Sequence, residues 1–359
     1  MITIVIVDDS PTARAHLRST LESDPELLVV AEAATGREAM RAIKKFEPRL
    51  VTMDVVLKGE NGLDVTAAIM SDSPRPIIVV TGLNSSDPDL VYKALDRGAL
   101  EVFPKLPPCQ SPQYAEASEK LVRLAKILSQ IPVTTRWRRN KTNPVATTTV
   151  SKASEQVVTT PRPTPRLKAA SAPNVLLFGA STGGPPVLNQ ILSSLARPIP
   201  IPIVIVQHIS AGFGSGFAQW LGDVTRLRCV SVQNRTILEP NTMYIAPDSE
   251  NIVFSSDRGL TSRPPEPSDR IIPSINAMFE SGALHFGSSA VGILLTGMGK
   301  DGAEGLKAIR NAKGSTFAQA PETCAVASMP NTAVSLDAVD EILRPDQIVD
   351  VLNRLLQGR

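Results

Sequence analysis

Short apolar runs alternate with amphipathic helical patterns along the first 130 residues, and this alternation strongly limits the possible folds. The candidate strands are Ile2–Val7, Leu28–Ala31, Leu50–Met53, Ile77–Val80 and Glu101–Phe103. The candidate helices lie near Pro11–Glu22, Arg37–Phe46, Leu63–Met70, Asp89–Arg97 and Tyr114–Gln130. Apolar strands separated by helices are typical of a parallel sheet that is covered on both faces. The sequence therefore predicts a doubly wound, flavodoxin-like domain over residues 1–130.

Residues 131–173 interrupt this pattern. The stretch 134–173 is rich in Thr, Pro and Ser and holds eight Lys or Arg against one acid. No helical or strand period survives there, so we expect a flexible linker with polyproline-like stretches. Beyond it the alternation resumes with longer loops, which predicts a second doubly wound, Rossmann-like domain over residues 174–359. The expected fold class is α/β, with two parallel-sheet domains joined by the linker.

Composition excludes several function classes. The formal net charge is +2, and the basic stretch 134–173 carries +7, so the rest of the chain carries −5. The folded parts therefore offer no basic face for nucleic acid. The three cysteines lack metal-ligand spacing, which indicates a reducing compartment. No apolar run approaches the roughly 20 residues of a membrane span. We expect a cytoplasmic protein that is not membrane-embedded, and nothing demands more than a monomer.

A glycine-rich turn in the second half carries the first candidate catalytic residue. The apolar run Val175–Phe178 leads into Gly179–Gly184, which reads Gly-Ala-Ser-Thr-Gly-Gly and places Ser181 where a buried strand ends. Glycines permit a sharp strand-to-helix turn, and the helix N-terminus supplies amide donors and partial positive charge. The pattern suits a nucleophile, although alone it also fits a phosphate-binding or purely structural turn. A P-loop is excluded because no Lys-Ser or Lys-Thr pair follows.

Two further strand ends supply the partners that a serine nucleophile needs. The apolar run Ile201–Gln207 ends at His208, and the run Ala290–Leu295 opens into a glycine-rich loop that contains Asp301. Sites in an open parallel sheet form beyond the carboxyl ends of the strands, so we expect these side chains at one edge. Ser181 would attack, His208 would take its proton, and Asp301 would fix the imidazole tautomer. The chain order Ser, His, Asp differs from that of α/β-hydrolases, chymotrypsin and subtilisin.

Four segments closely resemble the catalytic domain of chemotaxis protein-glutamate methylesterases, the CheB family. They are residues 179–184, 207–213, 243–247 and 295–302, and the similarity extends over nearly all of 174–350. The resemblance implies hydrolysis of glutamyl methyl esters on methyl-accepting chemotaxis receptors, with release of methanol. Many members of the family also deamidate receptor glutamines, so the resemblance implies this second reaction as well.

The same resemblance implies a role for each matching residue. Ser181 corresponds to the nucleophile, His208 to the base and Asp301 to the residue that orients it. The backbone N–H groups of Met298 and Thr182 correspond to the groups that face the oxyanion. No cofactor is implied for the esterase reaction.

Polar side chains follow the predicted strands of the first domain. Asp8 and Asp9 come directly after the first strand, and Asp54, Thr81 and Lys105 follow the third, fourth and fifth. Clustered carboxylates suit Mg²⁺, which prefers hard oxygen ligands, and lysine and hydroxyl groups can bind phosphoryl oxygens. The alternative is a set of ordinary loop carboxylates.

Residues 1–130 resemble a response-regulator receiver domain. The resemblance implies phosphoryl transfer from a histidine kinase to Asp54, with Mg²⁺ held by Asp8, Asp9, Asp54 and the backbone carbonyl of Val56. A phosphoryl group adds a charge of about −1.5 to −2, which is enough to bias an interface between two states. We expect the unphosphorylated receiver to pack near Ser181 and to obstruct large substrates.

The chain departs from the receiver pattern at several positions after the acidic pocket. Lys58 stands where proline is usual, Glu60-Asn61 replaces Met-Asp, Leu106 replaces a proline after the lysine, and Val102 occupies the aromatic switch position. These departures predict a changed loop after Asp54, an altered path for the lysine and weaker rotamer coupling.

Two other function classes compete with the enzyme. A DNA-binding response regulator needs a compact basic effector, whereas residues 174–359 are long, strand-rich and slightly acidic. A phosphorylation-gated interaction module without catalysis would fit the altered stretch 246–251, Ala-Pro-Asp-Ser-Glu-Asn, where the family usually carries a histidine. The complete set of serine, histidine and aspartate favours the enzyme.

Overall fold

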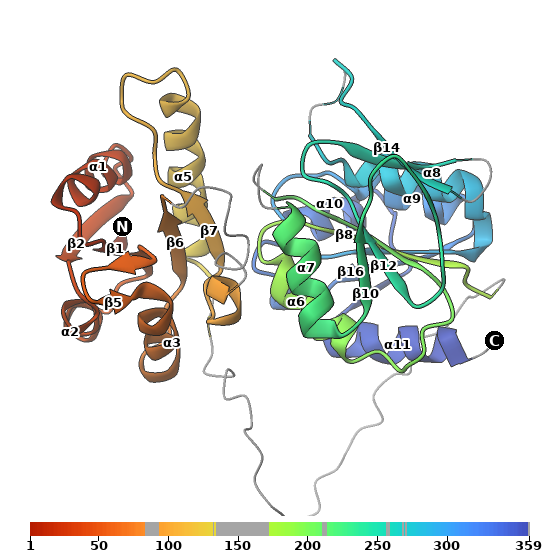
Figure 1. Cartoon of the computed structure of the whole chain (residues 1–359), viewed down its shortest axis with the longest axis horizontal. Helices are drawn as coiled ribbons and strands as arrows, with labels where there is room; N and C mark the ends of the chain where they lie inside the picture. Colours follow the sequence, from red (N-terminus) through yellow and green to blue (C-terminus); the bar gives the residue numbers. More distant parts are fainter. Residues whose placement is uncertain are drawn as a thin grey trace, which may run out of the picture.

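A computed structural model of the chain describes residues 1–82, 93–131, 133, 172–209, 214–255, 259–267, 269 and 271–357. It contains two α/β halves that lie side by side (Figure 1). The predicted linker 131–173 falls almost entirely outside the described residues, as do residues 89–92 of the predicted helix Asp89–Arg97; residues 93–96 of that helix are helical.

The N-terminal half contains a five-stranded parallel sheet in the order β2-β1-β3-β6-β7. Its strands are β1 (Ile2–Val7), β2 (Leu27–Ala33), β3 (Leu50–Met53), β6 (Ile77–Thr81) and β7 (Glu101–Pro104). Its main helices are α1 (Pro11–Leu21), α2 (Gly36–Phe46), α3 (Gly62–Asp72) and α5 (Tyr114–Leu128). Alternate side chains of β1 face opposite ways: Ile4 packs in a core with Leu17 of α1, and Val5 packs in a core with Ile43 of α2. The predicted doubly wound sheet is confirmed.

One element of this half has no counterpart in the predicted pattern. After Asp54 the chain forms a small antiparallel hairpin of β4 (Val56–Leu57) and β5 (Glu60–Asn61). Gly59 turns the hairpin with φ of +76°, a left-handed conformation that glycine adopts without strain. The segment 56–61 after Asp54, which contains Lys58, therefore forms a short hairpin.

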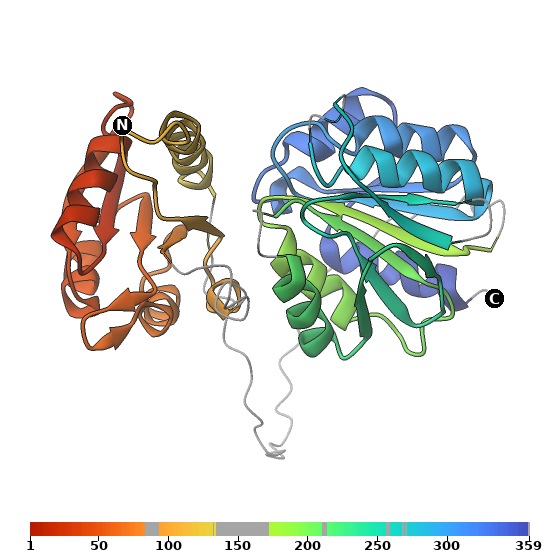
Figure 2. The ribbon, with the colours of Figure 1, turned by 45° about the horizontal axis from the view of Figure 1, so that its top comes forward.

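The C-terminal half contains a seven-stranded parallel sheet in the order β10-β12-β9-β8-β15-β16-β17. The strands are β8 (Val175–Ala180), β9 (Ile203–Gln207), β10 (Arg228–Ser231), β12 (Thr242–Ile245), β15 (Ala290–Leu294), β16 (Ser315–Gln319) and β17 (Glu341–Leu343). The helices α6 (Gly184–Ser193), α7 (Gly214–Thr225) and α11 (Pro345–Gln357) pack on one face. The helices α8 (Ile275–Phe286), α9 (Ala303–Asn311) and α10 (Ser328–Ser335) pack on the other, as Figure 2 shows. This half is also doubly wound, as predicted.

A second, antiparallel sheet in this half was not predicted. It joins β11 (Arg235–Ile237), β13 (Asn251–Phe254) and β14 (Gly259–Arg263) in the order β11-β14-β13. The backbone N–H of Phe254 donates to Ser281 Oγ of α8 at 3.2 Å, so the small sheet is attached to that helix. Its place matters because β13 begins at the altered stretch 246–251.

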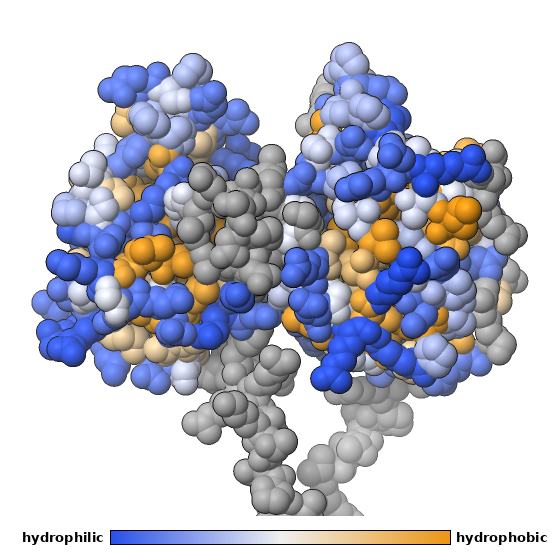
Figure 3. Space-filling model, viewed as in Figure 1, coloured by the Kyte–Doolittle hydropathy of each residue, from blue (hydrophilic) through white to orange (hydrophobic). Residues whose placement is uncertain are grey.

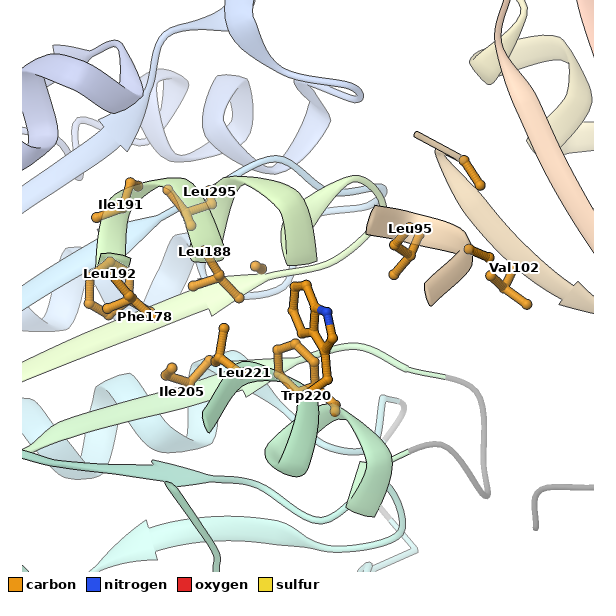
Figure 4. Close-up of a cluster of buried hydrophobic side chains, with 14 of the residues drawn as sticks. Leu95, Val102, Phe178, Leu188, Ile191, Leu192, Ile205, Trp220, Leu221 and Leu295 are labelled. Atoms are coloured by element: carbon orange, nitrogen blue, oxygen red, sulfur yellow. The ribbon is translucent and has the colours of Figure 1, made fainter. Parts of the chain in front are cut away.

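The two halves meet through an apolar cluster and a polar contact. Leu95 and Val102 of the first half belong to the same buried cluster as Leu188 and Trp220 of the second (Figure 4). The indole N–H of Trp220 donates to Asp96 Oδ2 at 3.1 Å. This junction places β7 and α5 of the first half next to the second domain.

Within the described ranges, no helix combines the length and the apolar composition that crossing a bilayer requires. The face seen in Figure 3 mixes hydrophilic and apolar residues on both halves and carries no broad apolar area.

Candidate active site

Three adjacent strands bring the predicted catalytic residues to one edge of the larger sheet. Ser181 directly follows β8, His208 directly follows β9, and Asp301 lies in the loop after β15. Strand β8 lies between β9 and β15, so all three residues leave the carboxyl ends of neighbouring strands. His208 Nε2 and Asp301 Oδ2 are 2.8 Å apart, and Ser181 and His208 line one cavity of about 500 Å³.

Ser181 sits on a turn that only glycines allow. Gly183 has φ of +75° and caps α6, which begins at Gly184. A Cβ on Gly183 would lie 2.3 Å from the Cβ of Ala325, so the position rejects any side chain. The backbone N–H of Ser181 donates to Thr296 O at 3.0 Å, which ties the turn to the strand end of β15.

The side chain of Asp301, in the loop after β15, lies against the N-terminus of α8. Its Oδ2 accepts hydrogen bonds from the N–H of Ile275 at 2.7 Å and from His208. Its Oδ1 accepts from the N–H groups of Asn276 and Gly302 at 3.1 and 3.0 Å. Burial alone would raise the pKa of Asp301, but the contact with His208 and these backbone donors lower the pKa below its ordinary value. The carboxylate is therefore held charged in a largely buried place.

The imidazole of His208 is oriented by its environment. Because Nε2 faces Asp301, Nδ1 is the nitrogen left to accept a proton from the serine. Gln207 fixes the backbone around it, since its side-chain Nε2 donates to the carbonyl oxygens of Ser181 at 2.8 Å and of His208 at 2.9 Å. The sequence alone indicates Gln207 only as the end of a strand, although its position directly before the histidine is visible there.

Two backbone N–H groups are available to a developing oxyanion. Among the described residues, the amides of Met298 and Thr182 donate to no acceptor, whereas the amides of Gly297 and Gly299 donate to Val326 O and Ser328 Oγ. A Cβ on Gly297 would lie 2.6 Å from the Cβ of Ser181, so this loop packs directly against the serine. Both predicted oxyanion residues also line the cavity.

The first half supplies one wall of this cavity. Residues of β7 and α5 lie along it together with Ser181 and His208, among them Glu101, Val102, Glu116, Lys120 and Arg123. Burial raises the pKa of the Glu101 carboxyl to about 7, although hydrogen bonds from Val102 and Thr182 and the charge of Lys120 act in the opposite direction. No pattern in the sequence reveals this residue, because its environment depends on how the halves pack.

The acidic pocket of the first half lies at the carboxyl edge of its own sheet. The carboxylates of Asp8, Asp9 and Asp54 offer oxygens within 4.8 Å of one another. Lys105 Nζ lies 2.8 Å from Asp54 and 3.0 Å from Asp8, so it reaches the pocket although Leu106 follows it. Burial raises the pKa of Asp54 above its ordinary value despite the lysine.

The remaining predicted members also lie at this edge. Thr81 ends β6 and is 3% exposed, and the backbone N–H of Lys105 donates to its carbonyl at 2.8 Å. Val56 donates a backbone hydrogen bond to Asp54. Three carboxylates that converge beside one lysine fit a hard divalent cation such as Mg²⁺.

Comparison with known proteins agrees with this geometry. The family model for CheB methylesterase matches residues 176–352, and the model for the response regulator receiver domain matches residues 4–112. The protein-glutamate methylesterase/protein-glutamine glutaminase 3 of Anaeromyxobacter dehalogenans is 36% identical over 353 residues, with 98% of each chain covered. The chain belongs to the CheB methylesterase family. The relationship expected from the sequence motifs is thereby confirmed.

Other members of the CheB family match over the same length. The protein-glutamate methylesterase/protein-glutamine glutaminase of Nitrosospira multiformis is 35% identical over 362 residues and covers 100% of this chain and 98% of its own. The solved catalytic domain of the CheB methylesterase of Thermotoga maritima aligns with a TM-score of 0.49 at 27% identity, over 52% of this chain and all of that domain. Because the Nitrosospira relative covers 100% of this chain, both halves have relatives in one family.

Proposed function

We propose that this chain is a phosphorylation-regulated protein-glutamate methylesterase that removes methyl esters from glutamates of methyl-accepting chemotaxis receptors. The observation that carries the proposal is the 2.8 Å contact between His208 and Asp301 at the strand ends that flank Ser181. The names of the relatives point to the same reaction and to a second one, hydrolysis of glutamine amides.

The ester reaction follows ordinary acyl transfer. Ser181 Oγ attacks the ester carbonyl carbon while its proton passes to His208 Nδ1, and Asp301 stabilises the resulting imidazolium. The tetrahedral intermediate collapses when the imidazolium returns the proton to the methoxy oxygen, and methanol leaves. Water then attacks the acyl-enzyme with His208 again as base, which releases the glutamate and restores the serine. A glutamine amide would follow the same route with ammonia as the leaving group.

The oxyanion of each tetrahedral intermediate needs preorganised donors. The amides of Met298 and Thr182 are unused among the described residues, and both residues line the cavity beside Ser181. Removing one such donor typically lowers the rate about 10²–10³-fold. Because both donors are backbone groups, the glycines that shape their loops matter more than the side chains of these two residues.

The receiver half would be phosphorylated on Asp54 by a histidine kinase. Asp8, Asp9, Asp54 and the carbonyl of Val56 would hold Mg²⁺, which neutralises charge on the incoming phosphoryl group when it is bound. Lys105, already 2.8 Å from Asp54, is placed to bind a phosphoryl oxygen, and Thr81 ends the neighbouring strand.

Regulation follows from the shared wall of the cavity. In this structure β7 and α5 lie beside Ser181 and His208, where a receptor helix would have to enter. Phosphorylation of Asp54 would shift the packing of this wall and admit the receptor. The cytoplasmic location and monomeric state indicated by the sequence stay predictions.

The test is methanol release from receptors that carry methylated glutamates. The native chain is compared with Ser181→Ala, each with and without a small-molecule phosphodonor and Mg²⁺, and Asp54→Asn serves as the control for regulation. Serine-dependent release that the phosphodonor increases only when Asp54 is present supports both parts of the proposal. If a cognate receptor yields no methanol under any condition, the chain is an interaction module and the enzymatic proposal is wrong.

A further inference from the structure

A buried asparagine lies behind the catalytic aspartate, in the stretch 246–251 that departs from the family pattern. Asn251 begins β13 and is 0% exposed, yet every polar atom of its side chain is used. Its Nδ2 donates to Asp269 Oδ2 at 2.9 Å, and its Oδ1 accepts from the backbone N–H of Ser274 at 2.7 Å. A buried amide that is fully bonded on both sides fixes the groups at its two ends.

One end of this arrangement leads to the triad. Ser274 caps α8, since its Oγ accepts from the N–H of Ala277 at 3.3 Å. The same Oγ lies 3.3 Å from Asp301 Oδ1, and the next two amides of the helix, those of Ile275 and Asn276, donate to Asp301. The start of α8 therefore carries most of the donors that hold the carboxylate, and Asn251 holds the start of α8.

The other end is anchored in the small antiparallel sheet. Asp269 accepts from Arg263 Nη2 at 3.1 Å and from the backbone N–H of Glu266 at 2.8 Å. Arg263 of β14 stands opposite Asn251 of β13 in the ladder. Asp269 itself lies in the loop after β14, and Arg263 ties that loop to the paired backbone of β13 and β14.

We infer that Asn251, together with its partner Asp269, is a positioning residue that sets the start of α8 and through it the placement of Asp301 against His208. Asn251 touches neither the imidazole nor the serine, so it acts only through the helix start. A misplacement of a catalytic group by about 1 Å can cost on the order of 10²-fold in rate. This inference rests on the proposed esterase function.

Exchanging the amide of Asn251 and the carboxylate of Asp269 tests this inference. Asn251→Asp puts a carboxylate against that of Asp269 and removes the hydrogen bond between them. The double variant Asn251→Asp with Asp269→Asn places an amide donor opposite an acceptor again and restores that bond at the same volume. Its recovery is partial, because the amide that replaces Oδ2 of Asp269 no longer accepts from Glu266 N–H and Arg263 Nη2. Asn353→Asp is the matched control, because Asn353 Oδ1 also accepts from a backbone N–H, that of Ala196 at 2.8 Å, on α11 away from the triad.

Methanol release is measured on the full chain with the phosphodonor and Mg²⁺ present. We expect Asn251→Asp to lower kcat about 10–100-fold with KM changed less than twofold, and to move the acid limb of the pH–rate profile. The double variant should be at least about threefold faster than Asn251→Asp, and Asn353→Asp should leave both the rate and the profile unchanged.

A second readout does not depend on any receptor. With ¹⁵N-labelled histidine only three imidazoles contribute signals, and the resonance of the His208 N–H bonded to Asp301 reports their contact. It should shift in Asn251→Asp and return in the double variant. If the native chain releases no methanol but this pattern holds, the esterase proposal fails and the positioning role stands. If the resonance and the pH profile stay unchanged, or if the double variant is no better than the single one, Asn251 is not a positioning residue.

Discussion

We expect Glu101 to make the contact between the two halves depend on pH. Its carboxyl belongs to β7, lines the cavity beside Ser181 and has a pKa raised by burial from 4.5 to about 7. When the halves separate, water reaches the carboxyl and its pKa returns toward 4.5. The closed state therefore holds a proton that the open state releases, and closure weakens as pH rises from 4.5 through 7.

The size of the effect follows from the two pKa values. The difference between a pKa of about 7 and one of 4.5, at about 1.4 kcal/mol for each tenfold step, gives roughly 3.4 kcal/mol, or about 300-fold in the equilibrium between closed and open states. This is an upper limit because the side chain keeps some exposure to water. Below pH 4.5 the carboxyl is protonated in both states and does not oppose closure. Above pH 7 it is ionised in both states, and the free-energy cost that it adds to closure no longer changes with pH.

The perturbation is Glu101→Gln, which keeps the shape of the protonated carboxyl and removes its titration. The variant should stay closed at all pH values as firmly as the native chain does at low pH. Without phosphodonor, the native rate of methanol release should exceed the variant rate about 10-fold or more at pH 8, and the ratio should fall to about fourfold or less at pH 5. The ratio cancels the titration of the triad, which both proteins share.

Two controls sharpen this experiment. Glu116→Gln removes an exposed carboxylate on α5 that lines the same cavity, and its ratio to the native rate should not change with pH. With phosphodonor and Mg²⁺ the native chain and Glu101→Gln should be equally active. A native-to-variant ratio that is flat from pH 5 to 8, or a variant that is faster than the native chain at pH 8, would refute the reasoning.

Three further outcomes are expected. Asp301→Asn should lower kcat about 10³–10⁴-fold while circular dichroism shows a native fold, because the imidazole loses the partner that fixes its tautomer. Ellman's reagent at pH 8 should label Cys109 quickly and the other two thiols slowly in the native chain, since Cys109 is exposed and burial raises the pKa of Cys229 and Cys324 to about 12. Lys105→Met should keep the basal rate of methanol release but lose its increase with phosphodonor, which a comparison of the two rates checks directly.

The central sheets and the meeting of the three candidate catalytic residues could be predicted from the sequence, because the end of a buried strand is visible in a short stretch of residues. A buried parallel strand is a continuous apolar run, so the residue after it marks the carboxyl edge of the sheet. Ser181, His208 and Asp301 could be placed together on that rule alone. The sheet of β11, β13 and β14 escaped prediction because its strands are three to five residues long and mix polar with apolar side chains. The bonds of Asn251 escaped for the same reason, since they join segments 18 and 23 residues apart without any repeating pattern.

Strand β7 explains why the role of Glu101 depends on the whole fold. Glu101 and Val102 at its start face the second half, and Lys105 directly after its end contacts Asp54. A strand of four residues is roughly 13 Å long, so the phosphorylation pocket and the cavity wall share one short rigid element. With a valine at the switch position, no large ring has to rotate for the pocket to act on the interface. If Lys105 moved toward a phosphoryl group on Asp54, it would pull on the backbone of β7, which also carries Glu101. The position of Glu101 against Thr182 is set by tertiary packing between the halves, which no periodicity within either half can encode.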